Sequence, residues 1–511
     1  MVQLWFNKTN MKIHALIIGG GIGGLATACL LAKKGYAVTL VEKNEEVGGV
    51  ASQFQAEGFT FDMGPSWYLM PDVFQNFFDL LGEKVEDHLQ LEKLSPSYRI
   101  YFKGRDEFVD LYSDLERDIP TFEKYEPGSG EVLREYLKLS GEQYKIALAR
   151  FMYKNNDTVF DFLNKEVAEA GRKLSVFGNM HAYVEKFFKS DEVQKILEYQ
   201  LVFLGSSPYN APALYNIMNH IDFEFGVYYP QGGIHQIPQA LKKIGEKLGV
   251  VYKTNAPVKR IFTGRGPRAT GVLLESGETI DADLIVSDAS IHHTETKLLP
   301  KPYRSFSDRY WKTRTLAPSA LIMYLGLKDK VPNIPHHNLI FAEKWQHHFD
   351  EIFKRPAWPN DPSLYVCAPS VTDETVAPEG KENLFVLVPI APGLEYSQAQ
   401  LETYADKILD VIEVEMKIPN LKERVEYRRL FSVKDFKSRY NNQNGTALGL
   451  AHSMMQTAIL RPNNVSKKLP NLFYAGANTN PGIGMPICLI SAELAYKRII
   501  GDESAGHLEE L

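Results

Sequence analysis

The chain has 511 residues, of which 44% are hydrophobic and 23% are charged. These fractions are typical of globular proteins and exclude a mainly disordered chain, and the length suggests about three domains or two large ones. With 57 basic and 63 acidic residues the net charge is −6, which excludes the basic excess of nucleic-acid-binding proteins, so we expect no nucleic-acid partner. Cys29, Cys367 and Cys488 are too widely spaced for a disulfide framework and favour a cytoplasmic protein.

The N-terminal region contains one stretch that resembles a membrane span. Ala15 to Ala32 carries no charge and is nearly long enough to cross a bilayer. Five glycines in its first ten residues argue against a continuous helix. The first ten residues of the chain lack the apolar segment of a signal peptide, so we expect neither a leader nor a span.

A βαβ unit is predicted at residues 13–42. Ile13 to Ile18 is an apolar run, Leu25 to Lys34 is helix-forming, Gly35 ends the helix, and Ala37 to Val41 forms a second apolar run that ends at Glu42. This order of elements predicts two parallel strands joined by a crossover helix.

The turn of this unit carries a phosphate-binding signature. Gly19, Gly21 and Gly24 form GxGxxG between strand and helix, where glycines let the backbone approach a pyrophosphate and the helix N-terminus supplies free N–H groups. Glu42 follows Gly24 by 18 residues, the position of a carboxylate that accepts from ribose hydroxyls. The pattern predicts dinucleotide binding; the alternative is a glycine-rich turn without a ligand.

The remaining chain suggests an interrupted nucleotide-binding domain. Strand patterns return after Tyr228, and Asn471 to Ala475 reads as a buried strand before a Gly/Pro turn and a last helix near Gly484 to Ile500. We expect the domain in three parts (11–70, 226–300 and 466–500), interrupted by a largely helical, substrate-contacting region (71–225) and a β-sheet substrate domain (301–465). The helices expected in the first interruption are Val73 to Leu81, Gly130 to Asn155 and Val184 to Leu204.

Further motifs carry a resemblance to a known family. Gly48 and Gly49 follow Glu42 by six and seven residues, and GFTFDMGPSW ends at Trp67; here the sequence resembles flavoproteins of the amine oxidase and carotenoid desaturase superfamily. Three stretches make it similar to the bacterial phytoene desaturases: YYPQGGIHQIPQAL, DPSLYVCAPSVTDETVAPEGKENLFVLVPIAP and NLFYAGANTNPGIGMPICLISAELAYK. The resemblance runs from about Met11 to Ile500. It departs at Val50, where the family usually has Arg, and at Asn478 and Asn480.

The resemblance implies an α/β fold: a Rossmann-like FAD-binding domain of the glutathione reductase-like type, a β-sheet substrate domain and an inserted helical region that associates with a membrane. It implies FAD as the cofactor. Together with the glycine motif it assigns the following residues to FAD binding: Gly19, Gly21, Ile22, Gly23, Gly24, Glu42, Lys43, Gly48, Gly49, Gly64, Pro65, Ser66, Val258, Ser287, Asp288, Gly476, Ala477, Gly482, Gly484 and Met485.

The implied activity is that of an FAD-dependent oxidoreductase acting on CH–CH bonds. A phytoene desaturase passes a hydride from a long linear polyene to flavin N5 while a proton leaves the neighbouring carbon, and oxygen or a quinone takes the electrons. No residue pattern identifies a catalytic acid or base. Because such a substrate resides in a bilayer, we expect a cytoplasmic protein bound peripherally to the membrane through Lys145 to Asn156 and Tyr183 to Ser190, which mix aromatic and basic residues. Ordinary packing helices are the alternative for both segments.

Three other functions stay open. The nearest is another carotenoid-modifying enzyme: a diapophytoene desaturase, a hydroxycarotenoid 3,4-desaturase, an isomerase or a ketolase. A flavin amine oxidase would need an aromatic cage for an amine. A non-catalytic prenyl-binding protein of the same fold would have no need for the flavin signatures present at both ends of the chain.

Histidine pairs occur at 292–293, 336–337 and 347–348. Adjacent side chains diverge on regular elements and so do not form a two-ligand site by themselves. We therefore expect no metal site.

Overall fold

The computed structural model describes residues 12–158, 178–202 and 204–511. The first ten residues, for which no signal peptide is predicted, lie outside the described residues, as do residues 159–177 of the predicted helical region.

A parallel five-stranded sheet carries the predicted βαβ unit, in the order β19-β13-β1-β2-β9. Its strands come from three distant parts of the chain: β1 (His14–Ile18), β2 (Ala37–Val41), β9 (Val251–Lys253), β13 (Leu284–Ser287) and β19 (Leu472–Tyr474). The strands predicted at residues 13–18, 37–41 and 471–475 are thereby confirmed. Because all strands run in parallel, their carboxyl ends meet at one edge of the sheet, where ligands bind in folds of this type.

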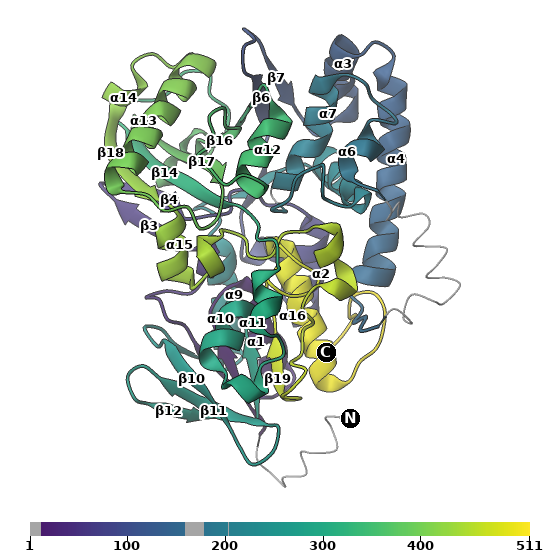
Figure 1. Cartoon of the computed structure of the whole chain (residues 1–511), viewed down its shortest axis with the longest axis vertical. Coiled ribbons are helices and arrows are strands. Elements are labelled where there is room, and N and C mark those ends of the chain that lie inside the picture. The colour runs from purple at the N-terminus through teal and green to yellow at the C-terminus, as the bar shows by residue number, and fades with distance from the viewer. Residues whose placement is uncertain (1–11, 159–177, 203) are drawn as a thin grey trace.

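Both faces of this sheet are buried. Ala15 and Ile17 point to one face and pack in the cluster that contains α1 (Ile22–Lys33), α9 (Gln236–Lys247) and α16 (Met485–Ile500). Leu16 and Ile18 point to the other face, which the antiparallel sheet β10 (Val258–Thr263), β11 (Ala269–Leu274) and β12 (Thr279–Asp281) covers. This alternation along β1 explains the unbroken apolar run in its sequence. Figure 1 shows these elements together in the lower half of the molecule.

A seven-stranded mixed sheet lies in the upper half of the molecule in Figure 1, in the order β18-β14-β17-β16-β15-β6-β7. Two of its strands come from the segment expected to be largely helical, and β6 pairs in parallel with β15. That segment therefore contributes directly to the second sheet. The strands are β6 (Tyr98–Phe102), β7 (Phe108–Leu111), β14 (Ser319–Leu327), β15 (His337–Phe341), β16 (Leu364–Cys367), β17 (Glu382–Ile390) and β18 (Val425–Phe431).

The two faces of the large sheet have different partners. Leu321 and Met323 of β14 pack with α13 (Gln398–Glu415). Ala320, Ile322 and Tyr324 point the other way, into a second core cluster rich in aromatic residues. The sheet thus has one face closed by a helix and one face turned towards the interior of the molecule. Shorter helices at its margin are α12 (Trp345–Phe353), α14 (Leu421–Arg424) and α15 (Val433–Tyr440).

The inserted region contains α2 (Pro71–Leu81), α3 (Leu115–Tyr125), α4 (Ser129–Ala147), α6 (Met180–Val184), α7 (Asp191–Glu198) and α8 (Ile217–His220). Of these, α3, α4, α6 and α7 lie together at the upper right of Figure 1. The single helix predicted from Val184 to Leu204 is wrong, because the Ser190 side chain accepts from Val193 N–H and starts α7 as a new helix. The helix predicted to reach Asn155 ends as α4 at Ala147 and continues only as a π-helical turn to Met152.

The smaller elements are β3 (Gln53–Ala56), β4 (Phe59–Asp62), β5 (Leu91–Lys93), β8 (Tyr228–Pro230), α10 (Ile291–His293) and α11 (Asp308–Lys312). Among the described residues, no helix combines the length and the apolar character that a membrane crossing requires.

Candidate active site

A cavity of about 1090 Å³ extends from the glycine-rich turn after β1 to the inner face of the large sheet. Of the predicted FAD-binding residues, all but four line it. Gly24, Ser287, Gly476 and Gly482 instead lie behind the wall: a Cβ on Gly476 would stand 2.1 Å from Asp288 Oδ1, and one on Gly482 would stand 2.1 Å from His452 Cε1. These two glycines allow neighbouring segments to pack closely.

The N-terminus of α1 opens into the cavity. Gly21 is its N-cap and has no side chain to satisfy the first N–H groups of the helix. A Cβ on Gly21 would stand 2.4 Å from Asp288 Oδ2, and one on Gly23 would stand 2.7 Å from Gly476 N. Only glycine fits at these two positions. Gly21, Ile22 and Gly23 border the cavity, so an anionic ligand there can approach this helix end.

Glu42 is fixed at the carboxyl end of β2. Its Oε2 accepts from Gly20 N–H at 2.7 Å and its Oε1 accepts from Asn44 N–H at 2.8 Å. The side chain is buried and borders the cavity. Each oxygen keeps a lone pair for a further donor, so the carboxylate is already oriented to accept from sugar hydroxyls.

Asp288 follows β13 and lies against the same helix end. Its carboxyl accepts from the N–H groups of Gly21 and Gly24, but burial, with a smaller contribution from the charge of Glu42, raises the pKa of Asp288 to about 8. The group is therefore mainly neutral at pH 7. A neutral carboxyl next to the α1 N-terminus does not repel a phosphate.

A second helix N-terminus opens into the cavity at α16. Gly484 is its N-cap, with φ +127°, and again provides no side chain. Behind this turn lies the buried Arg461, which donates to the carbonyls of Ala477 at 2.7 Å, Thr479 at 3.1 Å and Leu450 at 3.3 Å. Burial lowers the pKa of Arg461 to about 10. It remains cationic at neutral pH and holds the segment before α16 in place.

Val50 occupies the position at which the family usually has Arg. Its side chain is 41% exposed and borders the cavity. Two cations border the same cavity: Lys43 donates to the carbonyl of Ser438 at 2.7 Å, and Arg439 donates to Glu45 at 2.9 Å. Val50 itself brings no charge, but Lys43 and Arg439 from other elements still give this cavity positive charge.

A tyrosine–histidine pair lies on the cavity wall near the turn before α16. Tyr215 Oη is hydrogen-bonded to His452 Nδ1, and His452 Nε2 accepts from Ile483 N–H at 3.2 Å. Because Nε2 accepts, the proton of this neutral imidazole is assigned to Nδ1. Burial keeps the pKa of His452 well below its usual range. With both nitrogens engaged, the imidazole orients Tyr215 and has no lone pair left to accept a proton.

The other half of the cavity is apolar and mostly aromatic. Most of its residues are buried, and Phe151, Met152 and Leu387 are partly exposed. This half can therefore exclude water from a long hydrocarbon. Its lining includes Trp67, Tyr144, Phe151, Met152, Tyr199, Ile322, Leu339, Phe341, Trp345, Tyr365, Phe385 and Leu387.

The residues present fit a flavin dinucleotide. The two helix N-termini and Glu42 match the pyrophosphate, the ring and the ribose of such a group, and all three border the same cavity.

Comparison with known proteins agrees with this geometry. Residues 22–500 match the family of flavin-containing amine oxidoreductases. The chain belongs to this family. It is 46% identical over 489 residues to the carotenoid 3,4-desaturase of Haloarcula japonica, across 95% of this chain and 98% of that protein. It is 35% identical over 489 residues to the zeta-carotene-forming phytoene desaturase of Myxococcus xanthus, across 95% and 93%.

The fold of this amine oxidoreductase family member is shared with a solved oxidoreductase from Methanosarcina mazei, with a TM-score of 0.64 and 17% identity over 94% of this chain and 99% of that one. The predicted resemblance to carotenoid desaturases is confirmed, and the protein is an FAD-dependent oxidoreductase.

The sequence did not indicate every residue at the site of this family member. Tyr215, His452 and Arg461 belong to no motif predicted from the sequence, and Tyr215 meets His452 only because two distant segments of the chain lie on the same cavity. The expectation that adjacent histidines diverge is wrong for His336 and His337, whose ring centroids are 4.4 Å apart. The reason is that β15 begins at His337, so the alternation of a regular strand does not apply to His336.

Proposed function

We propose that the protein is a carotenoid desaturase that removes hydrogen across a C–C single bond of a long linear polyene of the phytoene class. The observation that carries this proposal is the continuity of one cavity, which has glycine-rich helix ends and Glu42 at one end and an aromatic, apolar wall at the other. A long hydrocarbon is the ligand that such a wall binds best. A second candidate substrate is a partly desaturated carotenoid, because the relative from Haloarcula japonica is a carotenoid 3,4-desaturase.

FAD, when bound, supplies the two-electron acceptor for this reaction, and oxygen or a quinone would reoxidise it. The main-chain N–H groups at the α1 N-terminus would bind its pyrophosphate, Glu42 its ribose and the α16 N-terminus its ring. The other predicted residues would border these groups: Lys43, Gly48, Gly49, Gly64, Pro65, Ser66, Val258, Ala477 and Met485.

The protein's own contribution to the reaction would be orientation and exclusion of water. The aromatic wall would hold the polyene extended, and Tyr215, kept in place by His452, lines the same cavity. The cation formed at an allylic carbon is delocalised over the neighbouring double bonds. For that reason the departing proton needs no strong base on the chain.

We also propose that the cavity opens towards a membrane surface. Phe151 and Met152 line the cavity and are partly exposed. Ala458 and Ile459 line it as well, and beside them Met455 is 69% exposed. Asn463 donates to Asp157 at 2.9 Å and joins these two segments. An apolar rim at the mouth of an apolar cavity would let a lipid-soluble substrate enter directly from the bilayer.

Of the two segments predicted to contact the membrane, Lys145 to Asn156 contributes to this mouth. Tyr183 to Ser190 remains a second candidate contact. The cysteines at 29, 367 and 488 are all free, which supports a location on the cytoplasmic side of the membrane.

The substrate proposal is tested by mixing the FAD-loaded protein anaerobically with liposomes that contain phytoene, a partly desaturated carotenoid or no polyene, and separately with amines. We expect bleaching of the flavin absorbance only with a polyene, together with a product of longer chromophore. Bleaching by amines alone would indicate an amine oxidase. A stable yellow protein that reacts with none of these compounds would contradict desaturation.

The membrane proposal is tested by flotation with polyene-free liposomes. Replacing both Met454 and Met455 by Ser is expected to reduce the floating fraction. Val414→Ser is the matched control, because Val414 is 70% exposed on α13, away from the cavity residues. Equal flotation of wild type and double variant would contradict a role for this rim.

A further inference from the structure

Three side chains of the types that bind metal ions meet in the large sheet. His337 is the first residue of β15, and its cross-strand partner on the antiparallel β16 is Cys367. His336 precedes the strand. One ligand atom of each residue lies within 4.8 Å of the other two, and all three residues are buried. The cluster was not expected from the sequence, because 30 positions separate the histidines from the cysteine.

The hydrogen bonds of the two imidazoles leave one nitrogen of each available. His336 Nδ1 is 2.8 Å from Thr372 Oγ1, and His337 Nδ1 is 2.7 Å from Tyr365 Oη. Both Nε2 atoms are buried and have no hydrogen-bond partner within the described part of the chain. Each ring thus keeps one nitrogen that can bind a metal ion.

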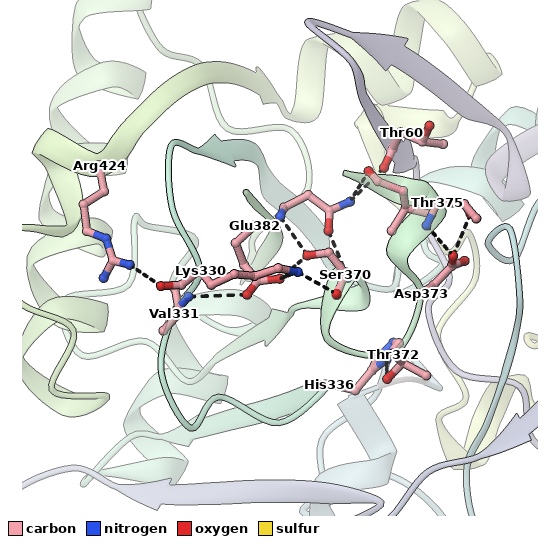
Figure 2. A network of polar contacts seen from close by, with 12 residues as sticks. Thr60, Lys330, Val331, His336, Ser370, Thr372, Asp373, Thr375, Glu382 and Arg424 are labelled. Carbon is pink, nitrogen blue, oxygen red and sulfur yellow. Dashed lines mark hydrogen bonds and ion pairs between the residues drawn. The ribbon is translucent and has the colours of Figure 1, made fainter. Parts of the chain in front are cut away.

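This arrangement matches the outer shell of known metal sites, where a ligating histidine uses its second nitrogen in a hydrogen bond that fixes the ring. Thr372, which plays this part for His336, belongs to the turn after β16. Figure 2 shows how that turn is held: Ser370 donates to the buried Glu382, and Asp373 accepts from Thr375 N–H at 2.9 Å. The orientation of His336 thus depends on a polar network that is itself largely buried.

We propose that His336, His337 and Cys367 bind one d¹⁰ metal cation, Zn(II) or Cu(I). Two imidazoles and one thiolate are the ligand set that these ions accept. Binding replaces the thiol proton of Cys367, which is released to solvent, by an S–metal bond. Ligand atoms around such an ion stand about 3.3 to 3.9 Å apart. The cluster would therefore contract by about 1 Å on binding, a shift that side-chain rotation can supply.

A fourth ligand is possible beside the cysteine. A cavity of about 20 Å³ is bordered by Cys367, Tyr229 and Asp62. This is enough for one water molecule, which needs roughly 10 to 15 Å³. Tyr229 also lies against His336, with 4.6 Å between the ring centroids. A four-coordinate zinc site with one water and a three-coordinate copper site are both compatible with this surrounding.

The metal site would lie one side chain behind the wall of the large cavity. Trp67 stacks on His337 with ring centroids 4.5 Å apart, and both Trp67 and Tyr365 border the cavity. A bound ion would hold this part of the wall rigid. The proposal does not rest on the proposed function, since it concerns residues that bind neither FAD nor substrate.

The test starts from the purified, FAD-loaded protein, stripped with a chelator under reducing conditions and then incubated with Co(II), as a probe for Zn(II), or with Cu(I). Metal and protein are quantified after gel filtration, and the absorbance is recorded. We expect one metal per chain and, with Co(II), a thiolate-to-metal charge-transfer band. Retention of Co(II) assigns a zinc site, and retention of Cu(I) alone assigns a copper site. A wild type that retains neither ion overturns the proposal.

Variants locate the site. Cys367→Ser is expected to abolish the charge-transfer band, and His336→Gln and His337→Gln to abolish metal retention. Thr372→Val, which removes only the outer hydrogen bond of His336, is expected to weaken binding about 10- to 100-fold. Cys29→Ser and His348→Gln are matched controls, because both residues are buried outside the cluster. If the cluster variants keep their flavin and still bind metal like the controls, the site lies elsewhere and the proposal fails.

Discussion

Gly23 in the first turn of α1 and Gly476 after β19 approach so closely that a Cβ on Gly23 would stand 2.7 Å from Gly476 N. The two glycines come from the first and the last segments that build the parallel sheet. Their contact joins the α1 N-terminus to the segment that leads into α16, so the two halves of the proposed FAD site pack directly against each other.

Gly23→Ala should therefore reduce flavin binding. The added methyl group would also stand 2.7 Å from Asp288 Oδ1, and such overpacking costs about 1 to 3 kcal/mol. The flavin content of the purified protein measures the effect. Gly128→Ala is the control: it forces φ +87° on a residue with Cβ but meets no atom within 4 Å, so it costs about 1 to 2 kcal/mol of stability without touching the site. If both variants kept the same flavin content, the close contact of Gly23 with Gly476 and Asp288 would not be needed for flavin binding.

Glu42→Ala should weaken FAD binding by about 1 to 3 kcal/mol, or roughly 5- to 150-fold in Kd, because buried ribose hydroxyls would lose their acceptor. Titration of the stripped protein with FAD, followed by flavin fluorescence, gives the Kd. Glu86→Ala, a substitution at an exposed glutamate, should leave the Kd unchanged. An unchanged Kd in Glu42→Ala would remove this residue from the ribose site.

FAD binding should weaken as the pH rises through about 8. The pKa of Asp288 is raised to about 8, so the carboxyl is neutral below this pH and gains a negative charge next to the pyrophosphate above it. Because of the same shift, the folded state keeps a proton on Asp288 between pH 3.8 and about 8, whereas the unfolded state has already released it. Stability should therefore fall across that range and level off above it.

Asp288→Asn separates this effect from other titrations. The amide keeps the shape of the side chain and cannot ionise, so its Kd for FAD should stay nearly flat from about pH 6 to pH 9. Parallel pH profiles of wild type and Asp288→Asn would show that another group causes the dependence.

Arg461→Gln should destabilise the protein by about 3 kcal/mol, because buried carbonyls of Leu450, Ala477 and Thr479 would lose a charged donor. Thermal unfolding in the presence and absence of FAD measures the loss. We expect a larger loss for the FAD-loaded protein, since Ala477 lies on the cavity. Arg265→Gln, at an exposed position between β10 and β11, is the control. Equal melting temperatures of the two variants would show that the hydrogen bonds of Arg461 to these carbonyls do not stabilise the protein.

Leu339→Phe should slow desaturation of a long polyene about 10- to 100-fold without changing FAD binding. Leu339 lines the apolar half of the cavity on β15, and a larger side chain there shortens the space for the substrate. Leu339→Met, which nearly conserves the volume, should remain active. The desaturation rates of both variants are compared on a longer and a shorter polyene, and the longer one should be affected more. An equal effect on both polyenes would show that Leu339 does not limit the length of the bound substrate.

The sequence predicted most of the nucleotide-binding sheet because its signals are local. The spacing of Gly19, Gly21 and Gly24 and the strand that ends at Glu42 depend only on neighbouring residues, and the structure places them accordingly. The division into domains remains a prediction. The breaks were harder to predict: α6 ends at Val184, and Ser190 then begins α7 through a single side-chain hydrogen bond, which periodicity does not show.

Long-range contacts were beyond prediction from this one sequence. β6 and β7 join the large sheet across more than 200 positions of chain. Arg461 reaches the α16 turn, and Cys367 reaches His337 through the register of β15 and β16. No local pattern specifies such pairings, because they follow from which strands become neighbours. The raised pKa of Asp288 has the same origin, since its burial results from segments that pack around it.

The strand order of the parallel sheet also affects how the protein is made. β19 lies at one edge next to β13, and α16 packs against α1. β19 and α16 therefore complete a sheet that β1 and β2 begin. During synthesis the glycine-rich turn emerges long before β19 and α16, which pack next to it in the folded chain. The nascent chain therefore cannot complete this site until α16 has been made, and loss of this helix should leave a chain without flavin even if its other parts fold.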